Sequence, residues 1–214
     1  MKALIYTGTK TLEFGEMPTP DLKPGQALVR VDSCGICGSD MHAWAGHDER
    51  RPAPLVLGHE VAGVVEQGAQ AGARVTVNPL AGCGTCVHCT NGRANLCGTR
   101  TILSMPPRQG GFAEYVVTPA QNMVVVPDDV PLAKASLAEP LACGWHGVRL
   151  GLKALDASLV KAPALVIGGG AIGVGAALSL RAQGFEDIVL VEPNEGRRAR
   201  IIETTGLNAV ADAS

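Results

Sequence analysis

The stretch that decides the fold of this 214-residue chain is Leu165-Val166-Ile167-Gly168-Gly169-Gly170-Ala171-Ile172-Gly173. Its apolar start is typical of a buried strand, its glycines predict a tight turn, and the small residues that follow, up to 183, predict a helix. A G-x-G-x-x-G motif that follows a strand and opens a helix indicates a dinucleotide site. We expect Gly168 to make the turn, Gly170 to admit a pyrophosphate, and Gly173 to let helix and strand pack closely.

The alternation of strand and helix continues beyond this motif. The apolar run 188–191 predicts a second strand that ends at Glu192, residues 196–205 predict a helix, and residues 209–211 predict the start of a third strand. Continuous apolar strands that alternate with helices are typical of a parallel, doubly wound sheet. The end of the chain is therefore predicted to be α/β.

Glu192 lies 24 residues after Gly168, where an acidic side chain accepts hydrogen bonds from the adenosine ribose. Its charge repels a 2′-phosphate, so NAD is favoured over NADP. NADP remains the alternative cofactor because of Arg197 and Arg198, since an arginine nearby can bind that phosphate. The alternative is that Glu192 is a solvated residue at the end of the strand and has no role in binding the cofactor. The predicted cofactor-binding residues are Gly168, Gly170, Ala171, Ile172, Gly173, Glu192 and Arg197.

The residues before about 130 have a different pattern, because short strand-like runs are broken by Gly and Pro. Such spacing predicts an all-β barrel or sandwich, and helical character begins only near Leu132. We therefore expect a β-rich domain over residues 1–150 and the first part of an α/β domain over residues 151–214. The predicted strands lie at 1–6, 27–31, 61–65, 74–77, 115–117 and 123–126.

Composition excludes several classes of protein. Hydrophobic residues make up 46% of the chain, too many for a disordered protein, and a formal net charge of −2 argues against nucleic acid as a partner. No apolar run approaches the ~20 residues that span a bilayer, and residues 1–6 contain no signal-peptide core. We expect a cytoplasmic protein with neither a membrane nor a nucleic-acid partner.

Four of the seven cysteines form the motif Cys83-x2-Cys86-x2-Cys89-x7-Cys97. In a reducing compartment this spacing is more typical of a metal site than of disulfides, and four thiolates suit a closed, structural zinc site. An iron–sulfur cluster is the rival, but ferredoxin runs continue with x3-Cys-Pro, whereas Gly98 follows here. Four buried cysteines without metal are the remaining alternative.

Other potential ligands lie in Cys34-Gly35-Ile36-Cys37-Gly38-Ser39-Asp40-Met41-His42 and in Gly58-His59-Glu60. A thiolate, an imidazole and a carboxylate are the ligand types of a catalytic zinc, with water in the fourth position. Each motif alone is a weak signal, since a lone His-Glu is usually a surface pair and a lone CxxC is often two buried small hydrophobes.

Together, these motifs resemble the zinc-dependent medium-chain alcohol and polyol dehydrogenases, and the resemblance extends from Met1 to the end of the chain. The glutamate of Glu139-Pro140-Leu141 resembles the sorbitol, idonate and threonine dehydrogenase branch, where it replaces a cysteine of the liver-type enzymes. The segments that carry the resemblance are 34–42, 58–60, 83–97, 110–115, 139–141 and 168–173.

The resemblance implies a GroES-like β-barrel catalytic domain followed by a Rossmann domain. That second domain is incomplete here, because a Rossmann unit has six strands and only 47 residues run from Gly168 to the end. Family members form homo-oligomers, and the surface that the usual dimer uses is missing from this sequence. The small-molecule partner implied is an alcohol or polyol.

The resemblance also implies two zinc ions, one structural and one catalytic. Cys37 and His59 are the implied catalytic ligands, and Glu60 and Glu139 are the carboxylate candidates. One thiolate and one carboxylate neutralise Zn²⁺, so we predict that only one of the two glutamates binds at a time. Asp40 is expected to orient His59, since ligating histidines usually donate their other N–H.

The implied reaction is hydride transfer to NAD from a secondary alcohol or polyol that zinc acidifies. Ser39 accepts the proton and His42 passes it to solvent, although either residue is otherwise an ordinary loop side chain. Trp44 is expected to line the substrate pocket or to be ordinary packing. Cys34 is expected to be structural, and Cys143 is expected to be a buried structural cysteine, with metal ligation as the alternative. A non-catalytic zinc-binding fragment of such a dehydrogenase is the alternative function.

Overall fold

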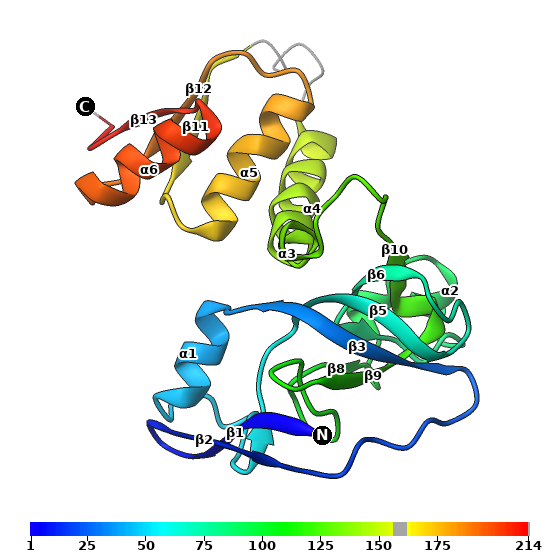
Figure 1. Cartoon of the computed structure of the whole chain (residues 1–214). Helices are drawn as coiled ribbons and strands as arrows, with labels where there is room; N and C mark the ends of the chain where they lie inside the picture. Colours follow the sequence, from blue (N-terminus) through cyan, green and yellow to red (C-terminus); the bar gives the residue numbers. More distant parts are fainter. Residues whose placement is uncertain (156–161, 214) are drawn as a thin grey trace. The chain divides into compact units, whose positions relative to one another are not determined.

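The computed structural model describes residues 1–155 and 162–213 and divides the chain into two compact units, Met1–Glu139 and Pro140–Ser214 (Figure 1). Within the part of the chain that it describes, no helix is both long and apolar enough to cross a bilayer.

The first unit is built around a five-stranded antiparallel sheet with the order β10-β6-β5-β3-β9. These strands confirm the β-rich prediction for the first half of the chain, and each overlaps a predicted run. Their bounds are β3 (Gln26–Gly35), β5 (Glu60–Gly68), β6 (Arg74–Val77), β9 (Tyr115–Pro119) and β10 (Met123–Val125). The described strands do not close into a barrel, because β9 and β10 remain the edges of an open sheet.

Branched side chains from these strands form the core of the first unit. Val29, Val61, Val65 and Val75 are all buried in one cluster with Leu103. Burying a valine side chain stabilises a fold by roughly 1.5 kcal/mol, so this cluster holds β3, β5 and β6 firmly together. The site residues at the ends of β3 and β5 are therefore attached to a rigid support.

Shorter elements surround this sheet. A hairpin of β1 (Lys2–Gly8) and β2 (Thr11–Glu16) pairs through β1 with β4 (Leu55–Val56), and β7 (Leu80–Ala81) pairs with β8 (Thr101–Ile102). The helical segments of this unit are short. They are α1 (Gly38–Trp44), α2 (Val87–Thr90), η1 (Ala94–Leu96), η2 (Ala120–Asn122) and α3 (Leu132–Ala135).

The second unit contains a parallel sheet of three strands in the order β11-β12-β13, as the strand and helix pattern predicted. Figure 1 shows the helices of this unit beside the sheet. The elements in chain order are β11 (Ala164–Ile167), α5 (Ala171–Ala182), β12 (Ile188–Val191), α6 (Glu195–Thr205) and β13 (Asn208–Val210).

Helix α4 (Ala138–Ala154) packs closely against α5. A Cβ atom on Gly144 would lie 2.6 Å from the backbone nitrogen of Ala176, so only glycine permits this approach. Val166 faces the core with Leu190, whereas Leu165 and Ile167 of the same strand are exposed. One face of the parallel sheet is therefore covered and the other exposes apolar side chains among the described residues.

Candidate functional site

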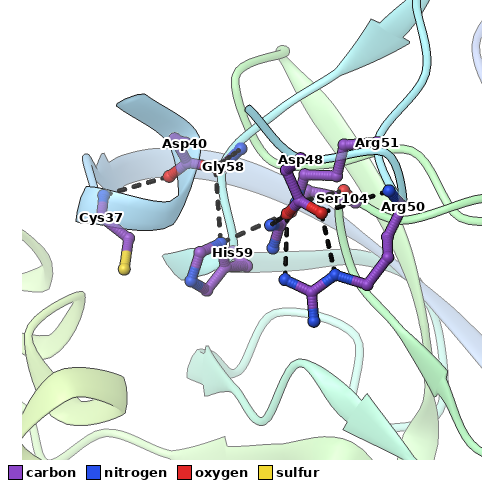
Figure 2. Close-up of polar contacts among 8 residues, drawn as sticks. All are labelled: Cys37, Asp40, Asp48, Arg50, Arg51, Gly58, His59 and Ser104. Carbon is purple, nitrogen blue, oxygen red and sulfur yellow. Dashed lines mark hydrogen bonds and ion pairs between the residues drawn. The ribbon is translucent and has the colours of Figure 1, made fainter. Parts of the chain in front are cut away.

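Asp40 connects the two segments that carry the predicted metal ligands. Its carboxylate accepts hydrogen bonds from the N–H of Cys37 (3.0 Å), at the start of α1, and from the N–H of Gly58 (3.1 Å), at the start of the next segment (Figure 2). Burial raises the pKa of Asp40, but its hydrogen bonds to His59, Gly58 and Cys37 outweigh burial and lower it. A charged Asp40 thus fixes the spacing of Cys37 and His59.

His59 faces Asp40 with its Nδ1 atom, 3.5 Å from Oδ1 of the carboxylate. Burial lowers the pKa of His59, but the hydrogen bond and charge of Asp40, together with the charges of Cys37 and Glu139, raise it to about 9. Since Nδ1 is directed at Asp40, Nε2 is the nitrogen left to bind a metal ion. Asp40 therefore has the position expected of a residue that orients His59.

The ligand atoms of Cys37, His59 and Glu60 all lie within 4.8 Å of one another. Gly35 pairs with Glu60 across β3 and β5, and a Cβ atom on Gly35 would lie 2.0 Å from the Glu60 Oε2 atom. The chain therefore needs glycine at position 35 for the Glu60 carboxylate to have its place beside the other two ligands.

This donor set fits a catalytic zinc ion. A thiolate, an imidazole and a carboxylate are soft, borderline and hard ligands, respectively, of the kind that open zinc sites use, and their two negative charges match Zn²⁺. Burial raises the pKa of Glu60, and the charges of Glu139 and Asp40 raise it further. Glu139 thus acts on the cluster through its charge, and it lies outside the group of ligand atoms that the described residues bring together.

The second cluster of potential ligands consists of Cys83, Cys86, Cys89 and Cys97, whose sulfur atoms also lie within 4.8 Å of one another. Backbone N–H groups of Thr85 and Cys86 donate to the Cys83 sulfur and lower the pKa of that thiol, which favours the thiolate. A Cβ atom on Gly82 would lie 2.7 Å from the Cys89 sulfur, so the loop closes tightly there. The cluster fits a structural zinc ion.

The glycine-rich turn of the second unit has the backbone that its sequence predicts. Gly168 has φ +103°, a left-handed value that favours glycine. No atom lies within 4 Å of a Cβ built on Gly170, so space is open there, whereas a Cβ on Gly173 would lie 1.8 Å from the Gly168 carbonyl oxygen. Ala171 and Ile172 form the start of α5 directly after this turn.

Glu192 follows β12 and faces the turn. Its carboxylate accepts hydrogen bonds from the N–H groups of Asn194 (2.8 Å) and Gly169 (3.1 Å), and the Arg197 guanidinium lies 3.0 Å away. These contacts lower the pKa of Glu192, with the Asn194 N–H as the largest cause. Arg197 is therefore engaged by Glu192 and is not free to bind another anion.

The comparisons with known proteins agree with this geometry. Residues 23–128 match the family model described as the alcohol dehydrogenase GroES-like domain. D-altritol 5-dehydrogenase from Agrobacterium fabrum is 35% identical over 100% of this chain and 64% of its own length. The chain belongs to the zinc-type medium-chain dehydrogenases.

Solved structures of dehydrogenases also match this chain. A protein described as a short-chain alcohol dehydrogenase from Escherichia coli, complexed with NADH, has a TM-score of 0.85 and 29% identity, over 98% of this chain and 62% of that one. A zinc-binding dehydrogenase from Sinorhizobium meliloti bound to NADP has a TM-score of 0.83 and 32% identity, over 98% and 61%. The chain thus spans less than two thirds of the length of these relatives.

The other residues singled out in the sequence have different surroundings. Ser39 is half-buried and His42 exposed, one turn apart on α1. Trp44 lines a cavity of about 690 Å³ in the first unit, together with Met41 and Phe112. Burial raises the pKa of Cys34 to about 12, so it remains a thiol. Cys143 was expected to be buried, and this was wrong, because α4 leaves it exposed.

Sequence reasoning missed a buried ion pair near the metal-ligand cluster. Arg51 Nη1 lies 2.5 Å from Asp48 Oδ2, and the side chains of both residues are buried. No motif in Asp48-Glu49-Arg50-Arg51 marks Arg51 as the arginine that turns inward. Hydrogen bonds from Arg50 and Arg51 lower the pKa of Asp48 to about 2.

Replacing Asp48 by asparagine is expected to destabilise the first unit by about 3 kcal/mol near neutral pH, because it leaves Arg51 buried without its counter-charge. A carboxyl with a lowered folded-state pKa stabilises above its ordinary value of 3.8, and that stability is lost as the pH falls toward about 2. The difference in unfolding free energy between wild type and D48N, measured with urea, should therefore shrink between these pH values.

A matched control for this measurement is Asp21→Asn, since Asp21 is exposed. D21N should lie within about 0.5 kcal/mol of wild type throughout, as exposed substitutions usually do. A D48N deficit that stays constant down to pH 2 would show that the ion pair is not its cause.

Proposed function

We propose that this chain forms the metal-binding part of a zinc-dependent oxidoreductase that transfers a hydride from a secondary alcohol or polyol to NAD. The observation that carries the proposal is the cluster of Cys37, His59 and Glu60, which matches an open catalytic zinc site in donor type and charge. Residues 1–150 are the GroES-like catalytic domain in this proposal, and residues 151–214 are the first part of a Rossmann domain.

A zinc ion bound there supplies Lewis acidity that makes an alcohol hydroxyl easier to deprotonate, and bound NAD supplies the hydride acceptor. Asp40 holds His59 in the orientation that leaves Nε2 for the metal. Ser39 Oγ, two residues after Cys37, accepts the hydroxyl proton from the substrate and at the same time passes its own hydroxyl proton on toward His42. His42, exposed one helical turn later, accepts a proton on its ring nitrogen and releases it to solvent. Glu139 is the alternative carboxylate ligand, and only one glutamate binds at a time.

The proposed cofactor is NAD, bound by Gly168, Gly170, Ala171, Ile172, Gly173 and Glu192. Support comes from the open space at Gly170, where a pyrophosphate can approach the start of α5. Further support comes from the Glu192 carboxylate, whose charge opposes a 2′-phosphate. The relatives include one structure with NADH and one with NADP, so the choice depends on Glu192 and its neighbour Arg197.

Replacing Glu192 by alanine is expected to shift the preference from NAD toward NADP by about tenfold, the size of one charge-assisted hydrogen bond. The substitution removes the ribose acceptor and releases Arg197, whose guanidinium contacts the carboxylate at 3.0 Å. Titration of both dinucleotides by calorimetry gives the ratio of dissociation constants. The exposed Glu195→Ala is the control with the same change of charge, and an equal shift in both variants would refute the role of Glu192.

The proposed substrate class is a secondary alcohol or sugar alcohol, as for the altritol dehydrogenase that this chain resembles. A panel of sugar alcohols, aldonates and simple secondary alcohols, followed by NADH absorbance with the zinc-loaded protein, tests the proposal. Turnover that disappears in Cys37→Ser is expected. Zinc binding without turnover of any panel member would favour the alternative, a zinc-binding fragment that has no activity of its own. We also propose that the protein forms homo-oligomers.

A further inference from the structure

Ser104 has an unusual backbone for a buried residue. Its φ is +61°, in the left-handed region that side-chain-bearing residues rarely adopt, and none of its surface is exposed. Among the described residues, the other non-glycine residues with positive φ are Lys10 and Gln70, and both are exposed. Backbone strain at a buried position persists only where the surroundings hold it, and it is common near functional sites.

Two contacts hold Ser104 in this conformation. Its carbonyl oxygen accepts a hydrogen bond from Arg51 Nε at 3.0 Å, and its hydroxyl lies 3.4 Å from His59 Nδ1. Figure 2 shows Ser104, Arg51 and Asp48 gathered beside His59. The chain of contacts therefore runs from Asp48 through Arg51 and Ser104 to His59.

Ser104 offers the Nδ1–H group of His59 a second hydrogen-bond acceptor, beside Asp40. When Nε2 binds a metal ion, Nδ1 carries the hydrogen and must donate it. Asp40 Oδ1 lies 3.5 Å away and already accepts from the Gly58 N–H, so its hydrogen bond to the imidazole is long and shared. The Ser104 hydroxyl approaches the same nitrogen at 3.4 Å and supplies a second acceptor. Two long, shared hydrogen bonds together fix the plane of the ring.

We propose that Ser104 is a positioning residue for the metal ligand His59, and that the buried Arg51–Asp48 ion pair holds Ser104 in place. This inference rests on the proposed zinc site. The ion pair contributes through its direct hydrogen bond to the Ser104 carbonyl, which prevents the strained peptide from relaxing and withdrawing the hydroxyl from His59.

The test compares Ser104→Gly, Ser104→Ala and the control Gln70→Gly. Glycine tolerates positive φ and relieves the strain at both positions, whereas alanine keeps it. S104G should therefore be more thermally stable than S104A, although both variants lose the same hydroxyl. Zinc affinity is measured by competition with a chelator. Co²⁺ absorption bands, recorded in place of zinc, report the ligand geometry at Cys37 and His59.

The expected result is that S104G and S104A both bind the Cys37–His59 zinc about 10–100-fold more weakly than wild type, with altered Co²⁺ bands. The zinc of the four-cysteine cluster should be unaffected in all variants, and Q70G should match wild type. Unchanged affinity in S104G, or a loss that follows thermal stability and appears only in S104A, would overturn the positioning role. A wild-type protein that binds zinc only at the four cysteines would instead refute the proposed function itself.

Discussion

Replacing Cys97 by serine is expected to unfold the loop from residue 82 to residue 97 and to release its zinc ion. Cys97 is the completely buried member of the four-cysteine cluster, and neither α2 nor η1 contributes a buried side chain to a core. The loop therefore depends on the metal for its structure. Structural zinc sites contribute binding free energy on the order of 10 kcal/mol, and the loss of one of four ligands removes much of it.

Hydrogen exchange of the amides in this loop measures the effect, with and without a zinc chelator. The wild-type loop should be protected and should lose its protection when the chelator is added, whereas C97S should be unprotected in both conditions. Cys143→Ser is the control, because Cys143 is an exposed cysteine in the second unit. Equal protection in C97S and wild type would mean that the loop folds without metal.

Gly173→Ala is expected to destabilise the second unit by about 3 kcal/mol and to abolish NAD binding. The added Cβ would lie 1.8 Å from the Gly168 carbonyl oxygen, and backbone on both sides of the turn prevents a small adjustment. The turn between β11 and α5 must therefore open, which separates the strand from its helix. Thermal unfolding and NAD titration of the same samples give both effects.

Gly170→Ala separates folding from binding at the same turn. No atom lies within 4 Å of a Cβ on Gly170, and its φ of −75° suits alanine, so G170A should fold like wild type. It should nevertheless bind NAD more weakly, because the added methyl group occupies the space that the pyrophosphate needs. If G170A binds NAD as wild type does, the proposed position of the pyrophosphate is wrong.

The elements that sequence reasoning predicts best are those fixed by local pattern. The apolar runs 164–167 and 188–191 form parallel strands because their hydrophobic side chains and glycine turns agree with each other. The four-cysteine loop was also predictable, since all of its ligands lie within fifteen residues and each spacing restricts the loop.

Contacts between distant segments could not be predicted in this way. Ser104 lies 45 residues from His59, and no spacing rule links a serine in a Pro-rich loop to the histidine just before β5. The inward turn of Arg51, beside the exposed Arg50, likewise depends on the buried Ser104 carbonyl. The exposure of Cys143 depends on which face of α4 packs against α5, and the apolar residues around it did not determine that face.

The central claim is that this chain binds two zinc ions at separate sites, and native mass spectrometry of the intact protein tests it most directly. Wild type should carry two zinc ions, and Cys37→Ser and Cys97→Ser should each carry one. Of these two variants, only Cys37→Ser should keep the amides of residues 82–97 protected from hydrogen exchange. A wild-type protein with a single zinc ion that is retained in Cys37→Ser would contradict the account.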